Sequence, residues 1–263
     1  MRTLYKGCKG ADVANLQYRL GIAPDGDFGN ITDKAVREAQ AKMGLKVDGY
    51  VGTNTQKAFD LSDFRVHVFD ANQVWFAGTP YNITPKPIRT LKQWATLERC
   101  DYVFNHVFFT MDGTGKTVTY LKAKGYDVGY GGIPERITVD ANNICGGAKL
   151  AVLDNRKQSV SYMGKRPRNA NGILTDGRYF QIQSVTACTE SAMVDYILSK
   201  YSVKIMMIQD GGGSTGFYDN TRGVLLAAEP EGKDGRPVAS VVCVTLNVVP
   251  QKKICPTCGQ EIK

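Results

Sequence analysis

Two copies of one short pattern lie within the first sixty residues, and they constrain the fold of this region more than any other feature. The pattern is D-G-x-x-G-x-x-T-x-x-A-Φ, where Φ is an apolar residue, and the copies occupy residues 25–36 and 48–59. In each copy the Asp-Gly pair predicts a tight turn, and the second Gly relaxes the backbone before a helix. Thr32 and Thr55 stand where N-cap residues stand, so each is predicted to begin a helix.

Apolar residues at helical spacing accompany the two copies. One set follows Gly10 and another runs between the copies; they are Val13, Leu16 and Leu20, and Ala35, Val36, Ala39, Met43 and Leu45. Spacings of three and four residues predict helices whose apolar sides share a core. The sequence therefore predicts a small three-helix domain over residues 1–62.

The same residues resemble the common peptidoglycan-binding module of bacterial and phage wall hydrolases. The resemblance covers residues 4–60 and rests on both copies together with Gly7, Lys9, Gly10, Val13, Leu16, Gln17, Leu20, Gln40, Gly44 and Leu45. It implies a peptidoglycan partner. Asp25, Asp48 and Tyr50 lie near the loops and are the candidate glycan-binding residues. The alternative is that the repeated residues serve turns, caps and core alone.

The composition leaves room for a second, larger domain and points to a polyanionic partner. Hydrophobic residues make up 43% of the 263 residues and charged residues 22%, an ordinary globular balance. The net charge of +8 favours partners that carry negative charge. Lysine and arginine are scattered rather than gathered on one arm or helix, which disfavours nucleic acid. Phosphate-bearing wall polymers are other candidate partners, and a solvated basic surface without a partner is the alternative.

Features of targeting are few. No apolar run of about 18 residues is present, so neither a transmembrane helix nor membrane insertion is expected. Residues 1–7 lack the apolar stretch of a signal peptide. We expect a protein that is made in the cytoplasm and acts on the bacterial cell wall after release at lysis, as an endolysin of phage origin does. The isolated cysteines are interpreted as buried free thiols; they are Cys8, Cys100, Cys145, Cys188 and Cys243.

The rest of the chain predicts a larger mixed α/β domain rich in strands, over residues 65–249, and hence an α+β fold for the whole. Helices are predicted over 90–100 and 190–199 from apolar residues on one face. Strands are predicted at 65–69, 101–109, 149–153, 179–183, 204–209 and 240–246. Residues 65–69 alternate polar and apolar side chains, whereas 204–209 is apolar without alternation and is typical of a buried strand.

The sequence Gln-Asp-Gly-Gly-Gly-Ser-Thr, residues 209–215, follows that buried strand directly. Three consecutive glycines cost backbone entropy, and they make sense where the backbone approaches a ligand with N–H groups able to hold a phosphate. Asp210 at the strand end is a candidate acid, base or metal ligand. The pattern is neither a Walker loop nor a dinucleotide fingerprint. A flexible hairpin loop is the alternative.

Residues 65–249 resemble the phosphodiester glycosidase family, which includes the enzyme that uncovers mannose-6-phosphate tags. The resemblance rests on the apolar strand that ends in D-G-G-G-S-T at 210–215, on N-H-V-F-F at 105–109, on the helix start at Thr189 and Glu190, and on R-P-V at 236–238. The sequence departs from the family at His106, which replaces a glycine. It also lacks the segment R-x-A-[IV]-G before Glu190.

The resemblance implies hydrolysis of a sugar–phosphate diester, which releases the sugar, leaves a phosphomonoester and requires no cofactor. The catalytic candidates are Asp210, Glu190, Asn105 and His106. The candidates for holding phosphate or substrate are Gly211, Gly212, Gly213, Ser214, Thr215 and Arg236. The residues alone leave other interpretations open: Glu190 suits the first turn of any helix, and His106 suits a core position.

The C-terminal tail, residues 250–263, carries Cys255 and Cys258 in C-P-x-C-G, the knuckle of zinc ribbons. A tetrahedral zinc site needs four ligands, and the knuckle supplies two. The other ligands could come from a second chain, with zinc shared across a dimer, or from distant cysteines such as Cys8 or Cys100. A basic tail without metal is the other interpretation.

Together these features predict a wall-targeted hydrolase that cleaves a sugar from a glycosyl-1-phosphodiester in a wall glycan or a teichoic-acid-like polymer. Two alternatives stay open. One is a non-catalytic protein that binds cell-wall glycans with both domains. The other is an intracellular enzyme of sugar phosphates whose N-terminal module has been repurposed.

Overall fold

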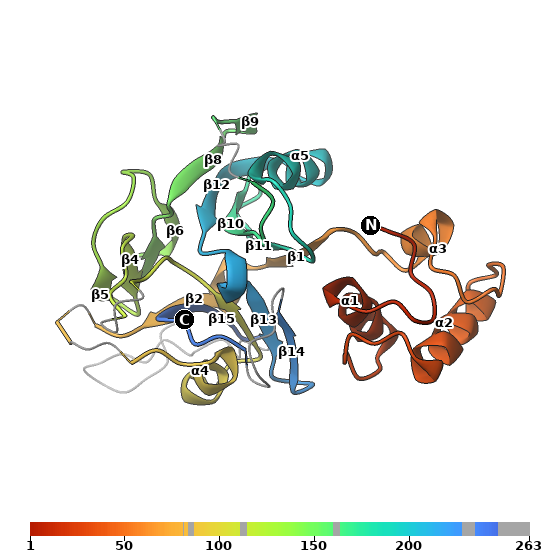
Figure 1. The fold of residues 1–263 in the computed structure, drawn as a ribbon. Helices are drawn as coiled ribbons and strands as arrows, with labels where there is room; N and C mark the ends of the chain where they lie inside the picture. The colour runs from red at the N-terminus through yellow and green to blue at the C-terminus, as the bar shows by residue number, and fades with distance from the viewer. Residues whose placement is uncertain (81, 84–86, 111–114, 160–163, 228–234, 247–263) are drawn as a thin grey trace, which may run out of the picture.

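The computed structural model describes residues 1–80, 82–83, 87–110, 115–159, 164–227 and 235–246. A small helical part and a larger strand-rich part lie side by side, and β1 leads from one into the other (Figure 1). The helical part contains α1 (Ala11–Leu20), α2 (Asn30–Lys42) and α3 (Thr53–Ala58). The three helices that the repeat predicts are therefore present.

The helices share one small apolar core. Its members include Leu4, Val13, Leu16, Phe28, Val36, Val51 and Phe59. Leu4 and Val51 also pair through their backbones, with Val51 N donating to Leu4 O over 2.8 Å. The start of the chain is thereby held against the second copy of the repeat.

A single buried glutamine organises the first copy. Gln17 Nε2 donates to Asp25 Oδ1 (2.6 Å), Asp27 O (3.0 Å) and Thr32 Oγ1 (2.9 Å). Its Oε1 atom accepts from Gly26 N over 2.8 Å. Every polar atom of this side chain is satisfied, so the loop is fixed by hydrogen bonds rather than by apolar packing.

Gln40 repeats this arrangement in the second copy. Its Nε2 donates to Asp48 Oδ1 (3.1 Å), Tyr50 O (3.0 Å) and Thr55 Oγ1 (3.4 Å), and its Oε1 accepts from Gly49 N (3.0 Å). The sequence repeat is therefore a repeat of one hydrogen-bond network.

The predicted N-cap role of the two threonines is wrong. α2 begins at Asn30 with Gly29 as its N-cap, and α3 begins at Thr53 with Gly52 as its N-cap. Thr32 and Thr55 lie inside the helices, where each hydroxyl donates back to a loop carbonyl and accepts from its glutamine. The threonines serve the loop network rather than the helix end.

Within the described residues, the larger part contains three antiparallel sheets. Their strand orders are β1-β11-β10-β12-β8-β9, β14-β13-β3-β15-β2 and β5-β4-β7-β6. The strands are β1 (Phe64–Phe69), β2 (Val74–Gly78), β3 (Tyr102–Asn105), β4 (Leu121–Ala123), β5 (Tyr126–Gly129), β6 (Ile137–Asp140), β7 (Asn143–Cys145), β8 (Lys149–Leu153), β9 (Arg156–Lys157), β10 (Asn169–Leu174), β11 (Tyr179–Ser184), β12 (Val203–Gln209), β13 (Gly216–Asp219), β14 (Val224–Ala227) and β15 (Ser240–Val244). Two 3-10 turns, η1 (Ala71–Gln73) and η2 (Gly212–Ser214), join strands.

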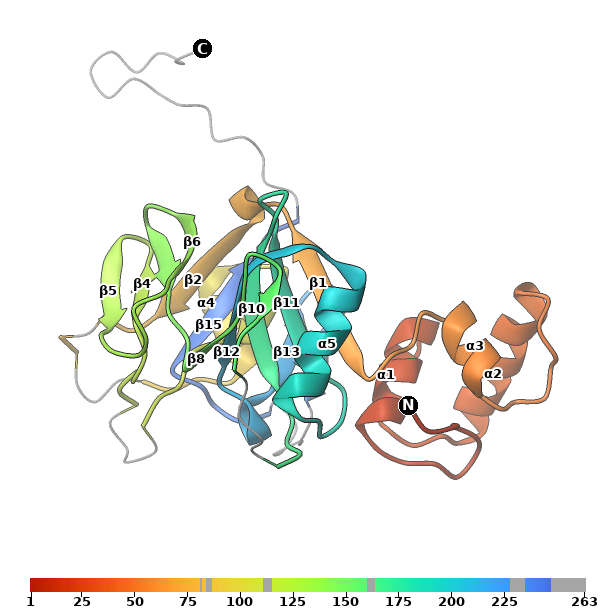
Figure 2. The same cartoon turned by 90° about the horizontal axis from the view of Figure 1, so that it is seen from above.

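The two larger sheets face each other, and one helix covers the outer face of each (Figures 1 and 2). α5 (Glu190–Lys200) packs on the six-stranded sheet through an apolar cluster that includes Met193 and Ile197. α4 (Leu91–Glu98) packs on the five-stranded sheet through Leu91 and Trp94. Aromatic side chains such as Phe104 fill the space between the sheets. The β12 strand therefore lies in a region that is covered on both sides.

The α+β fold predicted from the sequence is confirmed, with local differences. The two predicted helices of the larger part are α4 and α5. The strand predicted at 101–109 ends at Asn105, because the next residue leaves the sheet and its backbone O accepts from Asp210 N. The sequence did not predict β10, β13 or the four-stranded sheet.

None of the described helices has both the length and the apolar character needed to cross a bilayer. Cys8, Cys100, Cys145 and Cys243 are buried free thiols, and Cys188 is half-buried. The knuckle of Cys255 and Cys258 lies outside the described residues. Among the described residues, no three His, Cys, Asp or Glu side chains gather as a metal site would require.

Candidate active site

The glycine-rich segment leaves the end of β12 and is pinned on two sides. Asp210 N donates to His106 O (3.0 Å), and Asn105 Nδ2 donates to Asp210 O (2.6 Å). On the other side, Gly212 N donates to Pro167 O over 2.8 Å. The loop is thus held between the end of β3 and the residues that precede β10, and it is not a free hairpin.

The Asn105 side chain joins the segments of this arrangement by hydrogen bonds. Its Oδ1 atom accepts from Gly216 N and from Gln183 Nε2, both over 3.1 Å. Gln183 Nε2 also donates to Gly216 O over 2.8 Å. Asn105 is fully buried and all its side-chain polar atoms are engaged. Asn105 therefore bonds to the backbone of Asp210, and the catalytic role predicted for it stays a prediction.

The consecutive glycines have a steric cause. A Cβ atom at Gly211 would lie 2.7 Å from Pro167 O, so only glycine fits against that carbonyl. Gly212 has a φ of 60°, in the left-handed region that glycine adopts without strain. The first two glycines are thus required by the turn itself, before any ligand is considered.

The backbone N–H groups that were predicted to hold a phosphate are largely used within the protein. Gly212 N donates to Pro167 O, Ser214 N donates to Gly211 O, and Thr215 N donates to Gly212 O. The Thr215 side chain is fully buried. The charge of a bound phosphate would therefore be met by a side-chain cation rather than by this loop's amides.

Asp210 is the residue of the site whose pKa is shifted. Burial raises the pKa of its carboxyl from 3.8 to about 6, while a hydrogen bond from Ser214 and the charge of Arg236 oppose that rise. A carboxyl with this pKa exchanges a proton close to neutral pH. Arg236 belongs to the predicted R-P-V segment, whose Val238 pairs with Arg89 just before β15.

Glu190 lies in a buried ion cluster next to the loop. Arg168 Nη1 contacts Glu190 Oε1 over 3.1 Å, and Lys149 Nζ contacts Glu190 Oε2 over 3.5 Å. The Cα atom of Arg168 lies 3.6 Å from the Cβ position at Gly211, so the cluster backs onto the glycine turn. Glu190 is also the first residue of α5, which suits the helix dipole. The structure supports the helix-start interpretation of Glu190, and its catalytic role stays a prediction.

Arg168 is the site residue that sequence reasoning missed. Its guanidinium also donates to Gly164 O and to Cys188 O, so it ties the segment before β10 to the start of α5. In the sequence it stands two residues after Arg166, in a group that reads as ordinary surface charge. Pro167 immediately precedes Arg168, and its carbonyl holds the glycine turn. Nothing in the sequence indicated this role of Pro167 either.

His106 lies in the core between the sheets. It is 1% exposed, its Nε2 atom lies 3.2 Å from Asn171 Nδ2, and its ring lies 4.5 Å from that of Phe76. Burial lowers its pKa to about 3, so the ring is neutral. The structure places His106 away from any surface that a substrate reaches, as a packing residue rather than a catalyst.

The candidate glycan-binding residues of the helical part divide into two kinds. Asp25 and Asp48 each accept a backbone N–H two residues on, which lowers the pKa of both carboxyls and fixes the turns. Tyr50 is 54% exposed and lies 5.5 Å from the ring of Tyr5, which is 47% exposed. Sequence reasoning found one member of this pair of exposed aromatic rings, Tyr50.

Residues 9–59 match a protein family described as a putative peptidoglycan binding domain. The helical part is a domain of this family. None of the curated proteins compared with this chain matches it. The larger part of the chain has likenesses among solved structures.

A catalytic domain from zebrafish, N-acetylglucosamine-1-phosphodiester alpha-N-acetylglucosaminidase auto-inhibited by its pro-peptide, is similar with a TM-score of 0.53 and 12% identity, over 71% of this chain and 84% of that one. A hypothetical protein from Synechocystis gives a TM-score of 0.47 and 10% identity, over 69% of this chain and 58% of that one. The zebrafish likeness shows a shared fold for the larger part, and it matches the resemblance seen in the sequence.

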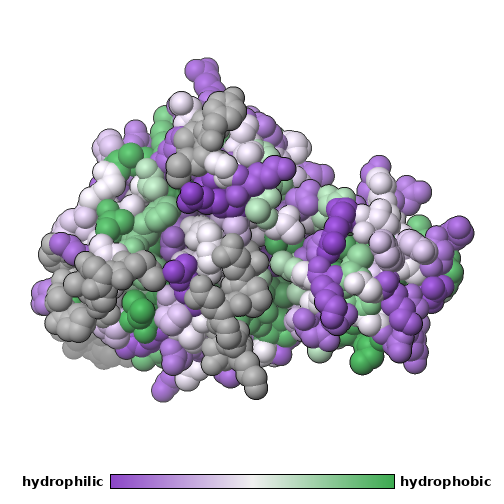
Figure 3. Space-filling view, in the orientation of Figure 1, coloured by the Kyte–Doolittle hydropathy of each residue, from purple (hydrophilic) through white to green (hydrophobic). Residues whose placement is uncertain are grey.

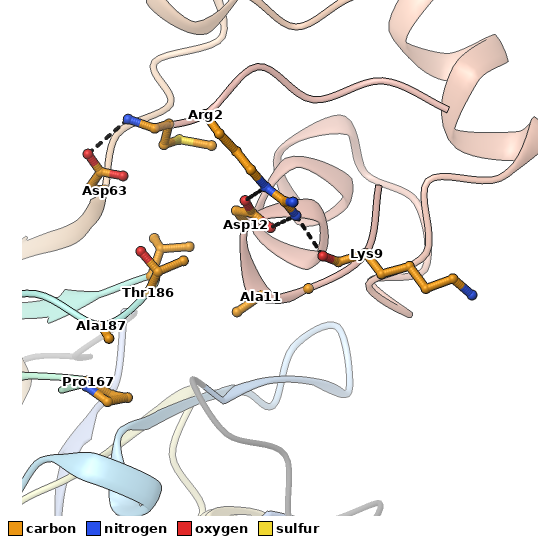
Figure 4. Close-up of a pocket in the computed structure, with 11 residues that line it drawn as sticks. Arg2, Lys9, Ala11, Asp12, Asp63, Pro167, Thr186 and Ala187 are labelled. Carbon is orange, nitrogen blue, oxygen red and sulfur yellow. Dashed lines mark hydrogen bonds and ion pairs between the residues drawn. The ribbon is translucent and has the colours of Figure 1, made fainter. Parts of the chain in front are cut away.

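The peptidoglycan-binding domain meets the larger part next to the glycine turn. A pocket of about 490 Å³ at this junction is lined by Arg2, Asp12 and Asp63 and, on the facing side, by Pro167, Thr186 and Ala187 (Figure 4). The charges are paired, with the N-terminal amine 2.9 Å from Asp63 and Arg2 2.7 Å from Asp12. In the space-filling view the two parts are separated by a hollow, and the outer surface of the binding domain is mostly hydrophilic (Figure 3).

Proposed function

We propose that this chain is a cell-wall hydrolase in which the peptidoglycan-binding domain holds the wall and the larger domain releases a sugar from a glycosyl-1-phosphodiester. The substrate would be a wall glycan or a teichoic-acid-like polymer. The observation that carries the proposal is Asp210: a half-buried carboxyl at the end of β12, with a pKa of about 6, beside Ser214 and Arg236. It stands on the loop and fold through which the chain resembles phosphodiester glycosidases.

The proposed reaction breaks the bond between the sugar C1 and the phosphate oxygen. Water supplies the oxygen that joins C1, and the phosphate leaves as a phosphomonoester. Such a monoester has a second pKa of roughly 6. Because Asp210 has a similar pKa, proton exchange between Asp210 and the leaving phosphate is nearly balanced in free energy. Arg236 supplies positive charge at the same place, and the Glu190–Arg168 pair holds the glycine turn from behind.

The test is release of sugar from a glycosyl-1-phosphodiester by the wild type and by Asp210→Asn. Removing a group that exchanges the proton lowers the rate by about 10²–10⁴. Asp140→Asn is the matched control, since Asp140 accepts backbone N–H groups in a turn at the end of β6 and has no proposed chemistry. Turnover near that of the wild type in Asp210→Asn would count against the assignment.

Binding to the wall is tested separately with purified sacculi and the full chain. Tyr50→Ala is expected to lower retention because it removes one ring of the exposed pair. Tyr130→Ala is the control, since Tyr130 is similarly exposed, at 52%, but lies in the larger domain. Equal retention of the two variants would remove the aromatic pair from the binding surface.

A non-catalytic wall-binding protein is the second candidate. It is favoured by the loop amides, which are bonded within the protein, and by His106, a buried residue in place of the family's glycine. Retention on sacculi without sugar release by the wild type would assign this function.

A further inference from the structure

A small cavity lies where α1 of the peptidoglycan-binding domain meets β1 and β3. It has a volume of about 170 Å³ and is lined by Asn15, Tyr18, Arg19, Arg65, Val66, His67 and Tyr102. Tyr18 fixes the junction here, because its hydroxyl donates to Asp219 Oδ2 over 2.8 Å and its ring meets Phe217 edge-on at 6.1 Å. The cavity is therefore bounded by residues from both parts of the chain.

Arg65 brings an unpaired positive charge to this cavity. It is 4% exposed, and its Nε and Nη2 atoms have no hydrogen-bond partner among the described residues. These two nitrogens form one edge of the guanidinium, the edge that binds an oxyanion through two parallel hydrogen bonds. Burial lowers the pKa of Arg65 to about 10, so the group remains charged at neutral pH. A buried charge without a counter-ion destabilises the fold.

The neighbouring basic groups add to this charge or leave it unchanged. Arg19 is a second cation on the cavity wall, and its charge lowers the pKa of Arg65 further. Its contact with Asp60 is long, at 3.5 Å, and both side chains are exposed, so that ion pair is weak. Burial lowers the pKa of His67 to about 3, so His67 is neutral.

Asp219 is the carboxylate that acts on this region, but its oxygens are already used. They accept from the Tyr18 hydroxyl, from Thr221 Oγ1 over 2.6 Å and from Arg222 N over 3.1 Å. The described residues therefore leave Arg65 without a counter-ion.

Asn15 adds a second requirement. It is 3% exposed, and its Oδ1 atom is buried without a hydrogen-bond partner. A group that satisfies both side chains must accept two hydrogen bonds from Arg65 and donate one to Asn15. Sulfate and simple carboxylates carry no proton at neutral pH, whereas a protonated phosphate has both acceptor oxygens and an O–H donor. The cavity has room for several waters at roughly 30 Å³ each, which is enough for one such group.

We propose that this cavity binds a protonated phosphate group, which Arg65 holds through Nε and Nη2 and Asn15 holds through Oδ1. Two sources share this chemistry: free inorganic phosphate and the phosphomonoester end of a larger molecule. Because α1 and β1 both line the site, binding stabilises the junction between the two domains. The cavity contains no residue of the Asp210 loop, so the proposal does not depend on the proposed reaction.

The experiment titrates the full chain with sodium phosphate by calorimetry at pH 7 and constant ionic strength, with sodium sulfate and glycerol phosphate as parallel ligands. We expect saturable binding of phosphate by the wild type, and binding at least tenfold weaker in Arg65→Met. We also expect phosphate to raise the melting temperature of the wild type but not of Arg65→Met. Binding of glycerol phosphate as tightly as phosphate assigns the site to phosphomonoester ends; binding of phosphate alone assigns it to the free ion.

Three further variants make the result specific. Arg178→Met removes an exposed arginine that pairs with Asp176, and it should bind phosphate as the wild type does. Arg65→Lys keeps the charge but not the two-nitrogen edge, so it should fold and bind weakly. Asn15→Leu should bring sulfate binding level with phosphate binding.

Absence of saturation in the wild type would mean that water alone solvates Arg65. Three results would overturn the proposal. They are absence of saturation in the wild type, unchanged binding in a folded Arg65→Met, and sulfate binding equal to phosphate binding in the wild type.

Discussion

Replacing Asp210 with asparagine should make the larger domain more stable at neutral pH while it removes the proposed chemistry. Burial raises the pKa of this carboxyl from 3.8 to about 6, so the folded state favours the protonated form. The stability that protonation provides is complete below pH 3.8 and is lost as the pH rises through 6. At pH 7 the free energy of unfolding of the wild type is therefore lowered by up to about 3 kcal/mol, since each tenfold change in proton affinity is worth about 1.36 kcal/mol.

Asparagine avoids this loss because it is neutral at every pH and keeps an oxygen that can accept from Ser214 and from Gly211 N. The expected gain in the free energy of unfolding is therefore up to about 3 kcal/mol at pH 7 and close to zero at pH 4. Such a trade between stability and activity is typical of catalytic carboxyls.

Denaturant unfolding followed by tryptophan fluorescence measures this gain. Both tryptophans of the chain, Trp75 in β2 and Trp94 in α4, lie in the larger domain, so the signal does not report the peptidoglycan-binding domain. Titrations at half-unit steps from pH 4 to pH 8 give the difference between variant and wild type. A difference that does not change with pH, or an Asp210→Asn protein less stable than the wild type at pH 7, would refute the electrostatic reasoning.

Three further predictions follow from individual groups. The rings of His67 and His106, both with a pKa lowered to about 3, should show neutral NMR shifts at pH 5; titration near 6.5 would contradict their burial. Because the folded state resists their protonation, the stability that they contribute should fall as the pH drops from 6.5 towards 3. Gln40→Ala should lower the free energy of unfolding of the binding domain by about 3 kcal/mol and reduce retention on sacculi, whereas exposed Lys34→Ala should not. Deletion of residues 250–263 should leave the melting temperature of the larger domain within a few degrees, and a large drop would indicate a structural metal site in the tail.

The sequence predicted the binding domain well because its determinants are local. Gln17 reaches all four of its partners within fifteen residues, and Gln40 does the same, so the network appears in the sequence as a repeat. The N-cap prediction failed for a related reason. A threonine hydroxyl near a helix start has several local partners, and here the glutamine and a loop carbonyl compete successfully with the first turn.

The larger site was predicted only in part because its contacts are distant in the chain. Asn105 reaches Gly216 across 111 positions, and Arg168 reaches Glu190 across 22. No spacing rule links such residues before the sheet order is known. Asp210 was accessible to sequence reasoning because a strand end followed by glycines is itself a local pattern. The positions around it become meaningful only once β3, β10 and β12 are placed beside one another.

The alternation at 65–69 shows how a correct strand prediction can still misplace side chains. Alternating polar and apolar residues ordinarily indicate a strand with one face in water. In β1 the apolar residues Val66 and Val68 pack towards α5, while Arg65 and His67 face the opposite sheet and the junction. The polar face is covered because the neighbouring domain and sheet lie against it. Burial of a charged side chain in this way is therefore a property of the tertiary arrangement and not of the strand.

The side chains packed next to Asp210 do not themselves change charge near neutral pH. The layer between the two large sheets there consists of amides, including Gln183, Asn171 and Gln209, which bond to one another, to backbone carbonyls or to Asn105. His106 in the same layer stays neutral above about pH 3. None of these groups changes charge between pH 4 and 8; the proton affinity of Asp210 is raised by burial and lowered by Ser214, by the charge of Arg236 and by the Gly211 backbone. The amide layer fixes the loop by hydrogen bonds between neutral groups, and it leaves the carboxyl free to titrate near neutral pH.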